Sequence, residues 1–361
     1  MTDKISVRQI CIIMCCFGAA LKLMLYPTTM AAACGNALWL PVLADTAIET
    51  LCVWAVAFLC SRTDKTLFQL IEGVAGRWAA RAVYALFALF FVANVFVPMS
   101  EQQLMVHEVF YDTIPSLLVF LPFFFFAVYA GTKRLTNAGR TADICLPVFA
   151  ITLAILIAMS LFECDFSNLL PFLKQPVSTL YSGCASGFFR FTQGAYLLMF
   201  MGHFDYKKGD CAKITLSCAA GGLIVAFVAA VFYAVYGNLA EVQYFAVTKI
   251  SIFFSAIALI GRTDLFAVYA LDIVMLFALA LNIQLACHCL EKAVGKPLRP
   301  VYSLAVNAVL ITLIFLFNNK FSLVQTIGSD WLVYAALIFA YVLPAAAWVF
   351  YALNKRRGGG Q

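Results

Sequence analysis

Long apolar runs separated by short polar segments make up almost the whole chain. A helix needs about 20 apolar residues to cross the hydrocarbon core of a bilayer. The pattern therefore predicts ten transmembrane helices, at 9–33, 37–60, 78–99, 116–132, 143–162, 177–203, 212–236, 264–290, 301–318 and 331–353. Residues 246–260 are also apolar, but this stretch is short and interrupted. We expect it to form a re-entrant or interfacial helix at the outer surface.

The positions of the basic residues agree with this count. If the N-terminus is cytoplasmic, 18 of the 24 Lys and Arg residues fall in inner loops or termini and four in outer segments. Such an excess of positive charge is typical of cytoplasmic loops. An even number of spans then places both termini in the cytoplasm. The two remaining basic residues, Lys22 and Arg190, lie inside predicted spans.

The composition narrows the class of protein. Hydrophobic residues make up 64% of the chain and charged residues 12%, whereas soluble domains carry about 25% charged residues. We therefore expect one integral membrane domain over residues 1–361, with the lipid bilayer as its surroundings. The net charge of +6 arises from short clusters rather than from a basic stripe with interleaved aromatic residues. The chain is therefore not expected to bind nucleic acid.

Ten spans divide into two sets of five, about 9–162 and 177–353, and an odd number of spans per set inverts the second set. Spans 1 and 6 then correspond to each other. Span 1 contains Lys22 and a Tyr-Pro step, while span 6 contains several glycines and Arg190. Interrupted helices at corresponding positions of an inverted repeat point to a binding site near the bilayer midplane. The expected fold is all-α, with helices 1 and 6 broken.

Unwound backbone at the two breaks leaves N–H and C=O groups that a ligand can satisfy. Half-helix N-termini attract a carboxylate and half-helix C-termini attract a cation, so the arrangement suits a zwitterion. We expect a small-molecule ligand to contact six residues of spans 1 and 6: Lys22, Tyr26, Gly187, Phe189, Arg190 and Gln193. The alternative is that the two cations pair with buried acids and serve structure alone. The two roles are compatible.

Four acidic residues are candidates for ion pairs or for proton coupling: Asp45, Glu49, Glu101 and Asp272. Asp45 and Glu49 lie one helical turn apart, on one face of span 2. Glu101 follows Pro98 at the outer end of span 3, where we expect a solvated, interfacial position, with a gate or proton relay as the alternative. Span 8 contains no Ser or Thr, which disfavours a sodium site. Proton coupling and the absence of coupling both remain open.

No pattern in the sequence favours catalysis or a cofactor. The chain contains no GxSxG elbow, Walker loop or HExxH motif, and His occurs three times. Cys287 and Cys289 flank His288, but three side chains this close together cannot form a closed four-ligand zinc site. A filter-like repeat of the kind found in channels is also absent. We therefore expect neither an enzyme nor a metal or cofactor site.

Residues 25–44 read LYPTTMAAACGNALWLPVLA, residues 166–200 begin FSNLLPFLKQPVS, and Arg262 and Asp264 precede span 8. These stretches resemble the spore germination permeases, the B subunits of germinant receptors in the amino acid–polyamine–organocation superfamily. The first resembles the family's broken span 1 and the Ala-Gly-x-x-Ala-Trp-like run after it. The second resembles its Asn-Leu-Leu-Pro segment before span 6, and the third its Arg-x-Asp/Glu start of span 8.

The resemblance implies a LeuT-like fold and the binding of a small germinant, often an amino acid, in an inner spore membrane or cell membrane. It also implies partnership with an A-type membrane subunit and a C-type lipoprotein subunit. Two departures fall in the expected pocket. Where the family reads Phe-Pro-Phe-Gly-Glu in span 6, residues 189–193 read Phe-Arg-Phe-Thr-Gln, and Lys22 stands where small residues are usual.

Three hypotheses follow. The chain is the ligand-sensing subunit of a germinant receptor, a free-standing secondary transporter of amino acids or organic ions, or a membrane scaffold in which Lys22 and Arg190 merely lock spans together.

Overall fold

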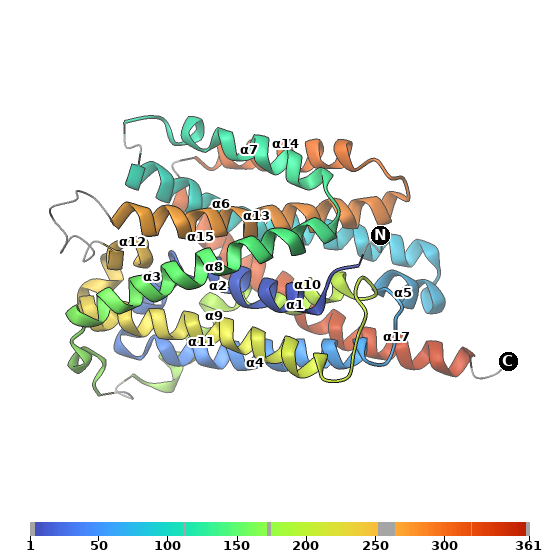
Figure 1. The fold of residues 1–361 in the computed structure, drawn as a ribbon, viewed down its shortest axis with the longest axis horizontal. Helices are drawn as coiled ribbons and strands as arrows, with labels where there is room; N and C mark the ends of the chain where they lie inside the picture. Colours follow the sequence, from blue (N-terminus) through green and yellow to red (C-terminus); the bar gives the residue numbers. More distant parts are fainter. Residues whose placement is uncertain (1–3, 111–112, 172–174, 252–263, 319, 359–361) are drawn as a thin grey trace.

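Helices that run side by side along one axis form the molecule (Figure 1). This computed structural model describes residues 4–110, 113–171, 175–251, 264–318 and 320–358, and these residues contain no strand. Each of the predicted spans coincides with a helix or with a group of consecutive helices. Both described ends of the chain lie at the same end of the bundle (Figure 1). That arrangement agrees with an even number of spans.

The first half of the chain begins with a capping box, in which Ser6 and Gln9 cap each other's backbone at the start of the first helix. A second capping box, Thr66 with Gln69, starts α5. The elements are α1 (Val7–Ile12), a π-helical turn (Ile13–Phe17), α2 (Gly18–Ala20), α3 (Tyr26–Cys34), a 3-10 turn (Gly35–Ala37), α4 (Trp39–Cys60), α5 (Leu67–Ala75), α6 (Arg77–Phe110), α7 (Ser116–Thr132), α8 (Leu135–Ser160) and two 3-10 turns (Leu161–Glu163 and Phe166–Leu169).

Like the first half, the second half begins with a broken helix that is followed by long, continuous helices. Its elements are α9 (Val177–Gly187), a 3-10 turn (Phe188–Arg190), α10 (Gln193–Phe200), α11 (Asp210–Tyr236), a 3-10 turn (Gly237–Val242), α12 (Ala246–Ser251), α13 (Asp264–Val294), α14 (Arg299–Leu316), α15 (Phe321–Thr326), a π-helical turn (Ile327–Leu332), α16 (Val333–Ala336), a second π-helical turn (Leu337–Val342) and α17 (Leu343–Gly358). The last five elements follow one another without interruption.

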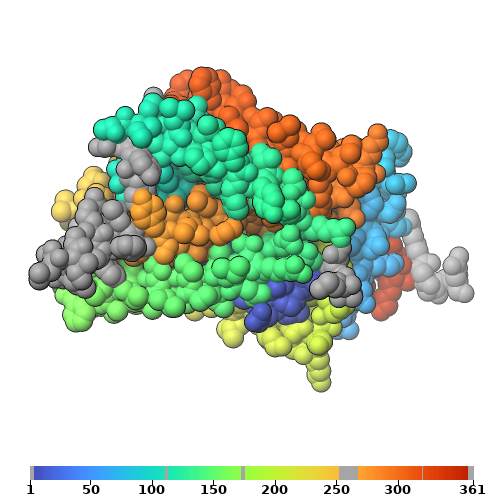
Figure 2. Space-filling model, turned by 45° about the horizontal axis from the view of Figure 1, so that its top comes forward, coloured from blue at the N-terminus to red at the C-terminus, as the bar shows by residue number. Residues whose placement is uncertain are grey.

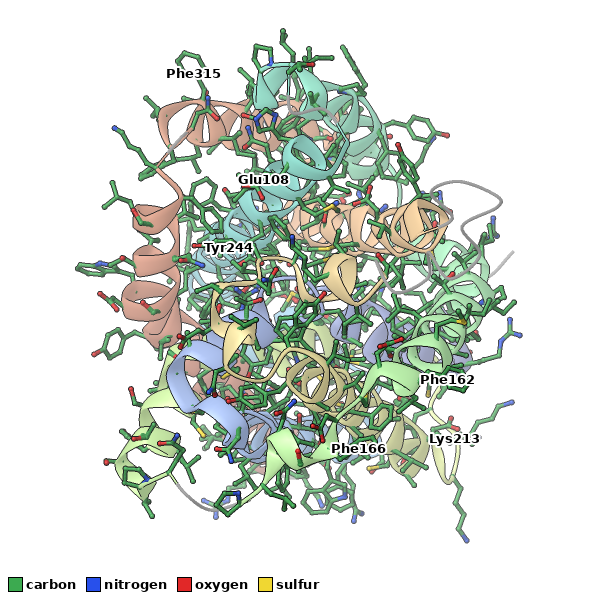
Figure 3. The ribbon with its side chains drawn as sticks, turned by 90° about the vertical axis from the view of Figure 1, so that its left-hand side faces the viewer. Glu108, Phe162, Phe166, Lys213, Tyr244 and Phe315 are labelled. Carbon is green, nitrogen blue, oxygen red and sulfur yellow. The ribbon has the colours of Figure 1, made fainter. Side chains whose placement is uncertain are left out.

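The outer surface of the bundle is apolar. Large hydrophobic side chains such as Phe162, at 85% exposure, and Phe315, at 64%, point away from the helices, as the end-on view shows (Figure 3). An apolar surface of this extent is stable only against lipid, because in water it would drive association. Among the described residues, seven helices are each long and apolar enough to cross a membrane. The predicted spans 1, 4 and 6 are shorter or broken, so the total of ten remains a prediction.

The closest helix packing joins predicted counterparts. The most extensive contacts in the described chain are those of α6 with α13 and of α4 with α11. In a repeat of five plus five spans, α4 corresponds to α11 and α6 to α13. These two pairs surround the broken helices and hold them in the interior. The boundaries of the two repeats, 9–162 and 177–353, remain predictions.

The short helix α12 covers the first part of the segment 246–260, for which a re-entrant or an interfacial helix was expected, and its burial does not fit the interfacial alternative. Most of its residues are buried, and it contacts α11, α13 and α3. Residues 252–260, as well as Arg262, lie outside the described residues. The backbone N–H of Ala246 donates to the carbonyl of Met24. This part of the segment is therefore a support for the break in span 1 rather than a surface element.

Candidate functional site

Both predicted breaks are present in the structure. The first lies at residues 21–25, between α2 and α3, and the second at residues 191–192, ahead of α10. Pro27 occupies the first turn of α3, where its missing N–H removes no helical hydrogen bond. The free carbonyl of Met24 accepts its hydrogen bond from Ala246 at 2.8 Å. The unwound backbone is thus partly satisfied by a neighbouring element, as the low-dielectric interior requires.

Lys22 lies in the first break and forms a buried ion pair with Glu49 of α4. Its Nζ is 2.8 Å from Oε2 of Glu49, and the two side chains are 2% and 1% exposed. The other carboxylate oxygen, Oε1, accepts a hydrogen bond of 3.0 Å from the backbone N–H of Gln193, the first residue of α10. The ammonium also lies 3.8 Å from the centre of the Phe191 ring. One carboxylate therefore joins the two breaks, at the helix end where the dipole favours an anion.

Arg190, beside the second break, is paired as well. Its two terminal nitrogens donate to the two carboxylate oxygens of Glu101 of α6, with Nη1 3.0 Å from Oε2. The guanidinium also lies 4.8 Å from the centre of the Phe189 ring and 5.7 Å from that of Tyr26. Such a bidentate pair fixes the orientation of both side chains.

The prediction that Glu101 occupies a solvated, interfacial position is wrong, because its side chain is 1% exposed. A buried carboxylate needs a partner, and Arg190 supplies it. Asp45 and Asp272 are buried too, but they join no ion pair with the described residues. Both carboxylate oxygens of Asp45 and one of Asp272 lack a hydrogen-bond partner there. Glu49 and Glu101, rather than Asp45 and Asp272, are therefore the acids that hold the two cations.

Two glycines allow the broken helices to approach each other. A Cβ atom on Gly187 would lie 2.4 Å from Cε2 of Tyr26, which is fully buried and cannot move aside. A Cβ on Gly18 would lie 1.8 Å from the side-chain nitrogen of Gln193. Glycine at 187 therefore sets the spacing between span 1 and span 6, whereas a Cβ at position 18 would meet the flexible end of the Gln193 side chain.

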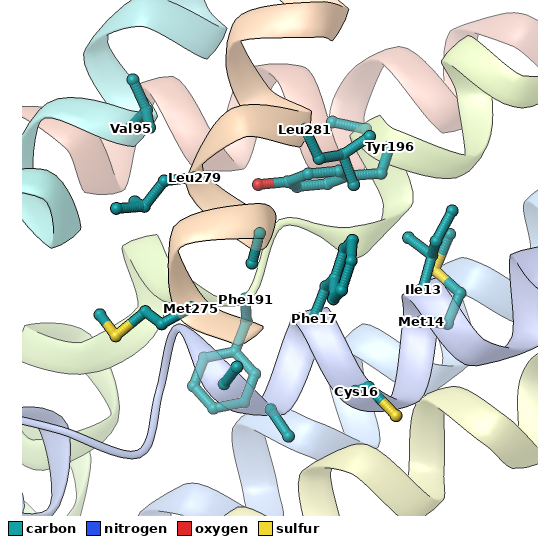
Figure 4. Packing of buried hydrophobic residues seen from close by; sticks show 14 of the residues in the cluster. Ile13, Met14, Cys16, Phe17, Val95, Phe191, Tyr196, Met275, Leu279 and Leu281 are labelled. Carbon is teal, nitrogen blue, oxygen red and sulfur yellow. The ribbon is translucent and has the colours of Figure 1, made fainter. Parts of the chain in front are cut away.

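A cavity opens where the π-helical turn Ile13–Phe17, α2, α6, α10 and α13 meet. Figure 4 shows Phe17, Tyr196 and Leu281 gathered at this point, with Ile13 and Met14 on the adjoining turn. The apolar lining is formed by Ile13, Met14, Phe17, Leu21, Pro98, Phe189, Ala278 and Leu281. Gly18 and five polar residues complete it: Asn94, Arg190, Thr192, Gln193 and Tyr196.

The polar side of the cavity is a connected hydrogen-bond network. The side-chain amide of Asn94 lies 3.3 Å from the hydroxyls of both Thr192 and Tyr196. The Tyr196 hydroxyl donates to Oδ1 of Asn282 on α13 at 2.7 Å. The side-chain oxygen of Gln193 has no hydrogen-bond partner among the described residues. The network joins α6, α10 and α13, and it leaves one buried acceptor at the cavity wall.

Three of the six residues predicted to contact a ligand line the cavity: Phe189, Arg190 and Gln193. The other three, Lys22, Tyr26 and Gly187, lie behind its wall. The Tyr26 ring packs edge-on against Phe191, with 5.9 Å between ring centres. Lys22 points to Glu49. These three residues hold the breaks together and do not face the cavity in this structure.

Four residues of this network were not among those predicted from the sequence: Asn94, Thr192, Tyr196 and Asn282. Asn94 and Asn282 carried a usable signal, since each is an amide in the middle of an otherwise apolar run. A buried amide needs hydrogen-bond partners, so it marks the inner face of its helix. Thr192 and Tyr196 carried no comparable signal, because hydroxyl-bearing and aromatic residues are common throughout this chain.

Comparisons with known proteins agree with this geometry. A family model described as "spore germination protein" matches residues 4–322. Among solved structures, the crystal structure of MhsT in complex with L-phenylalanine is similar, with a TM-score of 0.61 over 96% of this chain and 98% of that chain. The identity is 14%, so the likeness concerns the fold alone, which is that of the LeuT-like transporters. No curated protein sequence matches the chain.

Proposed function

Because the chain belongs to the spore germination permease family, we propose that it is the ligand-sensing, permease-like subunit of a germinant receptor. In this proposal a small ligand binds in the cavity beside the two broken helices, and its binding triggers germination. A-type and C-type receptor subunits are the proposed partners, and the inner spore membrane or the cell membrane is the proposed location, with both termini in the cytoplasm.

One observation carries the proposal. The cavity lies where both interrupted helices meet two uninterrupted ones, α6 and α13, and its wall includes a polar network on one side and apolar side chains on the other. Sites for small molecules generally combine a mainly apolar wall with a few fixed polar groups. A ligand here would contact both interrupted helices as well as α6 and α13.

The charges near the cavity indicate the class of ligand. Arg190 is neutralised by Glu101, and Lys22, behind the wall, by Glu49. A ligand with a net charge would bring an uncompensated charge into a buried site, which is costly. We therefore propose an amino acid zwitterion with an apolar side chain, or a neutral molecule of similar size. The L-phenylalanine in the complex of the structural neighbour makes this amino acid a reasonable first probe.

A thermal-shift screen of the purified chain tests the proposal. The probes are L-phenylalanine, L-leucine, L-alanine, glucose and inosine, with L-aspartate and L-lysine as charged counterparts. A ligand at 100 times its Kd stabilises the folded state by about 2.7 kcal/mol. We expect one or more of the uncharged or zwitterionic probes to raise the unfolding temperature, and the charged ones to have little effect.

A matched pair of variants shows whether the ligand occupies this cavity. Asn94→Leu removes a polar group from the cavity wall, whereas Asn307→Leu removes another buried amide, from α14, away from the cavity. We expect the ligand-induced shift to disappear in the first variant and to persist in the second. A shift that survives Asn94→Leu unchanged would place the ligand elsewhere.

A free-standing transporter is the second candidate, and a specific observation favours it. Phe17 and Leu281 line the central cavity and also a separate crevice between α7, α8 and α13. Only a few side chains therefore separate the central cavity from this crevice. Uptake of a labelled ligand into proteoliposomes that contain this chain alone would support transport. Binding without uptake, together with capture by A-type and C-type subunits, would support the receptor.

A further inference from the structure

We propose that the crevice between α7, α8 and α13 binds an anionic phospholipid, with the phosphate at its basic rim and an acyl chain along its apolar floor. This site is distinct from the central cavity, and lipid binding here does not depend on the function proposed for that cavity. In the space-filling view, α13 is visible in a hollow strip between α7 and α8 (Figure 2).

Two cations at the rim carry the argument. Lys133, directly after α7, and Arg140, in the second turn of α8, both line the crevice. Neither forms an ion pair with a described residue, unlike Lys22, Arg190 and Arg299, each of which is paired with an acid. The Lys133 ammonium rests over the Tyr129 ring, 4.1 Å from its centre. Two unpaired cations at the mouth of one crevice create a site for a phosphate group.

The position of this rim suits a lipid headgroup. The turn between α7 and α8 lies at the end of the bundle that carries both described chain ends (Figure 1). The charge pattern predicts that this is the cytoplasmic end, where anionic lipids attract nearby basic residues. The first turn of α8 also has no side-chain cap, and Asn137 and Ala138 from that turn line the crevice. The positive end of the α8 dipole adds to the positive potential at the rim.

The walls below the rim favour a lipid over a free anion. They are mostly apolar and include Phe126, Ala130, Phe277 and Ala280. The mouth is flanked by Tyr129, which is 61% exposed, and Ile144, which is 70% exposed, so the crevice opens on the lipid-facing surface. An inorganic anion would gain nothing from such walls. An acyl chain fits these walls. Because it moves into them from the equally apolar bilayer interior, it gains packing contacts rather than a hydrophobic driving force.

Because the acyl chain gains little on transfer, selectivity between lipids must come from the headgroup. Each Lys or Arg near an anionic membrane surface contributes about 1 kcal/mol. Two such residues predict a preference for phosphatidylglycerol over phosphatidylcholine with the same acyl chains of roughly 30-fold.

Native mass spectrometry of the full chain in detergent measures this preference. The protein is titrated with phosphatidylglycerol, with phosphatidylcholine of the same chain length and with inorganic phosphate. The test variant is Lys133→Gln/Arg140→Gln, and the matched control is Lys207→Gln/Lys208→Gln, which removes the same charge from an exposed segment at the same end of the bundle. Thr141→Trp narrows the crevice without changing any charge.

We expect phosphatidylglycerol to bind the wild type and the control alike and to bind the double test variant roughly 30-fold more weakly. Thr141→Trp should also weaken it, and inorganic phosphate should not compete at millimolar concentration. Equal binding of both lipids, or equal loss in the test and control variants, would overturn the proposal. Effective competition by inorganic phosphate would show an ion site rather than a lipid site. The unfolding temperature of each variant, recorded without lipid, shows that the fold is retained.

Discussion

Glu49 binds Lys22 through one carboxylate oxygen, with 2.8 Å between the charged atoms, and the start of α10 through the other. The residue thus lies on α4, outside both broken helices, and holds the break of each. The arrangement places a fixed cation and a fixed anion in the interior, where a mobile ion is often used to neutralise the ends of half-helices. Burying the two charges costs desolvation free energy, and their mutual attraction offsets this cost only while both partners are present.

The first prediction concerns this pair. Lys22→Met and Glu49→Gln should each lower the free energy of unfolding by about 3–5 kcal/mol, because each leaves a buried group without its partner. The double variant should lose less than the sum of the two. Unfolding of the purified protein in detergent gives the three values.

Lys213→Met is the control for that cycle, since Lys213 pairs with Asp210 but is 67% exposed. Its cost should be much smaller, because the Lys213 ammonium is solvated and Asp210 keeps its hydrogen bond from the backbone N–H of Lys207. Additive losses in the double variant would mean that the two residues act independently. If Lys22→Met also leaves ligand affinity and its pH dependence unchanged, Lys22 has no part in the binding site.

The second prediction concerns the pair of Arg190 with Glu101. Glu101→Gln removes the negative charge and leaves a guanidinium at the cavity wall with no counter-ion. Hydrogen bonds to a charged group contribute about 1.5–3 kcal/mol. The affinity for L-aspartate should therefore rise at least about tenfold relative to that for its neutral isostere, L-asparagine. Isothermal titration with both amino acids measures the change.

A matched control is Glu291→Gln, because Glu291 pairs with Arg299 at a distance from the cavity. This variant should not change the ratio of the two affinities. An unchanged ratio in Glu101→Gln, in a protein that still binds L-asparagine, would show that Arg190 does not face the ligand.

The third prediction concerns the contact between Gly187 and Tyr26. Gly187→Ala forces a methyl group against a buried ring, and such overpacking costs about 1–3 kcal/mol. The cost should fall when the same change is made in a Tyr26→Ala background, because the ring is then absent. Unfolding temperatures of the four proteins give the coupling.

Ser182→Ala, on the exposed face of the same helix, serves as the reference and should change stability by no more than about 0.5 kcal/mol. Equal costs of Gly187→Ala in both backgrounds would show that the backbone of α9, rather than the contact with Tyr26, requires glycine.

The sequence alone determined that the chain is an all-helical membrane protein and where its helices break. Apolar runs of fixed length, the positions of the basic residues and the Tyr-Pro step are local features, and the bilayer converts local hydrophobicity directly into helices. Lys22 and Arg190 were recognisable as unusual because a cation in a hydrocarbon span is costly wherever its partner lies.

Only the tertiary structure decided which residues meet. Asp45, Glu49 and Asp272 were all candidate partners for a buried cation. Asp45 and Glu49 share one face of α4, and the depth at which the break in span 1 meets α4 selected Glu49. Glu101 was expected in water because it is near a span end, but α6 continues to Phe110 and carries it into the interior. Asn94, Tyr196 and Asn282 come from three helices, and their meeting depends on how those helices rotate about their axes. That rotation follows from packing between segments far apart in the chain, which no local pattern records.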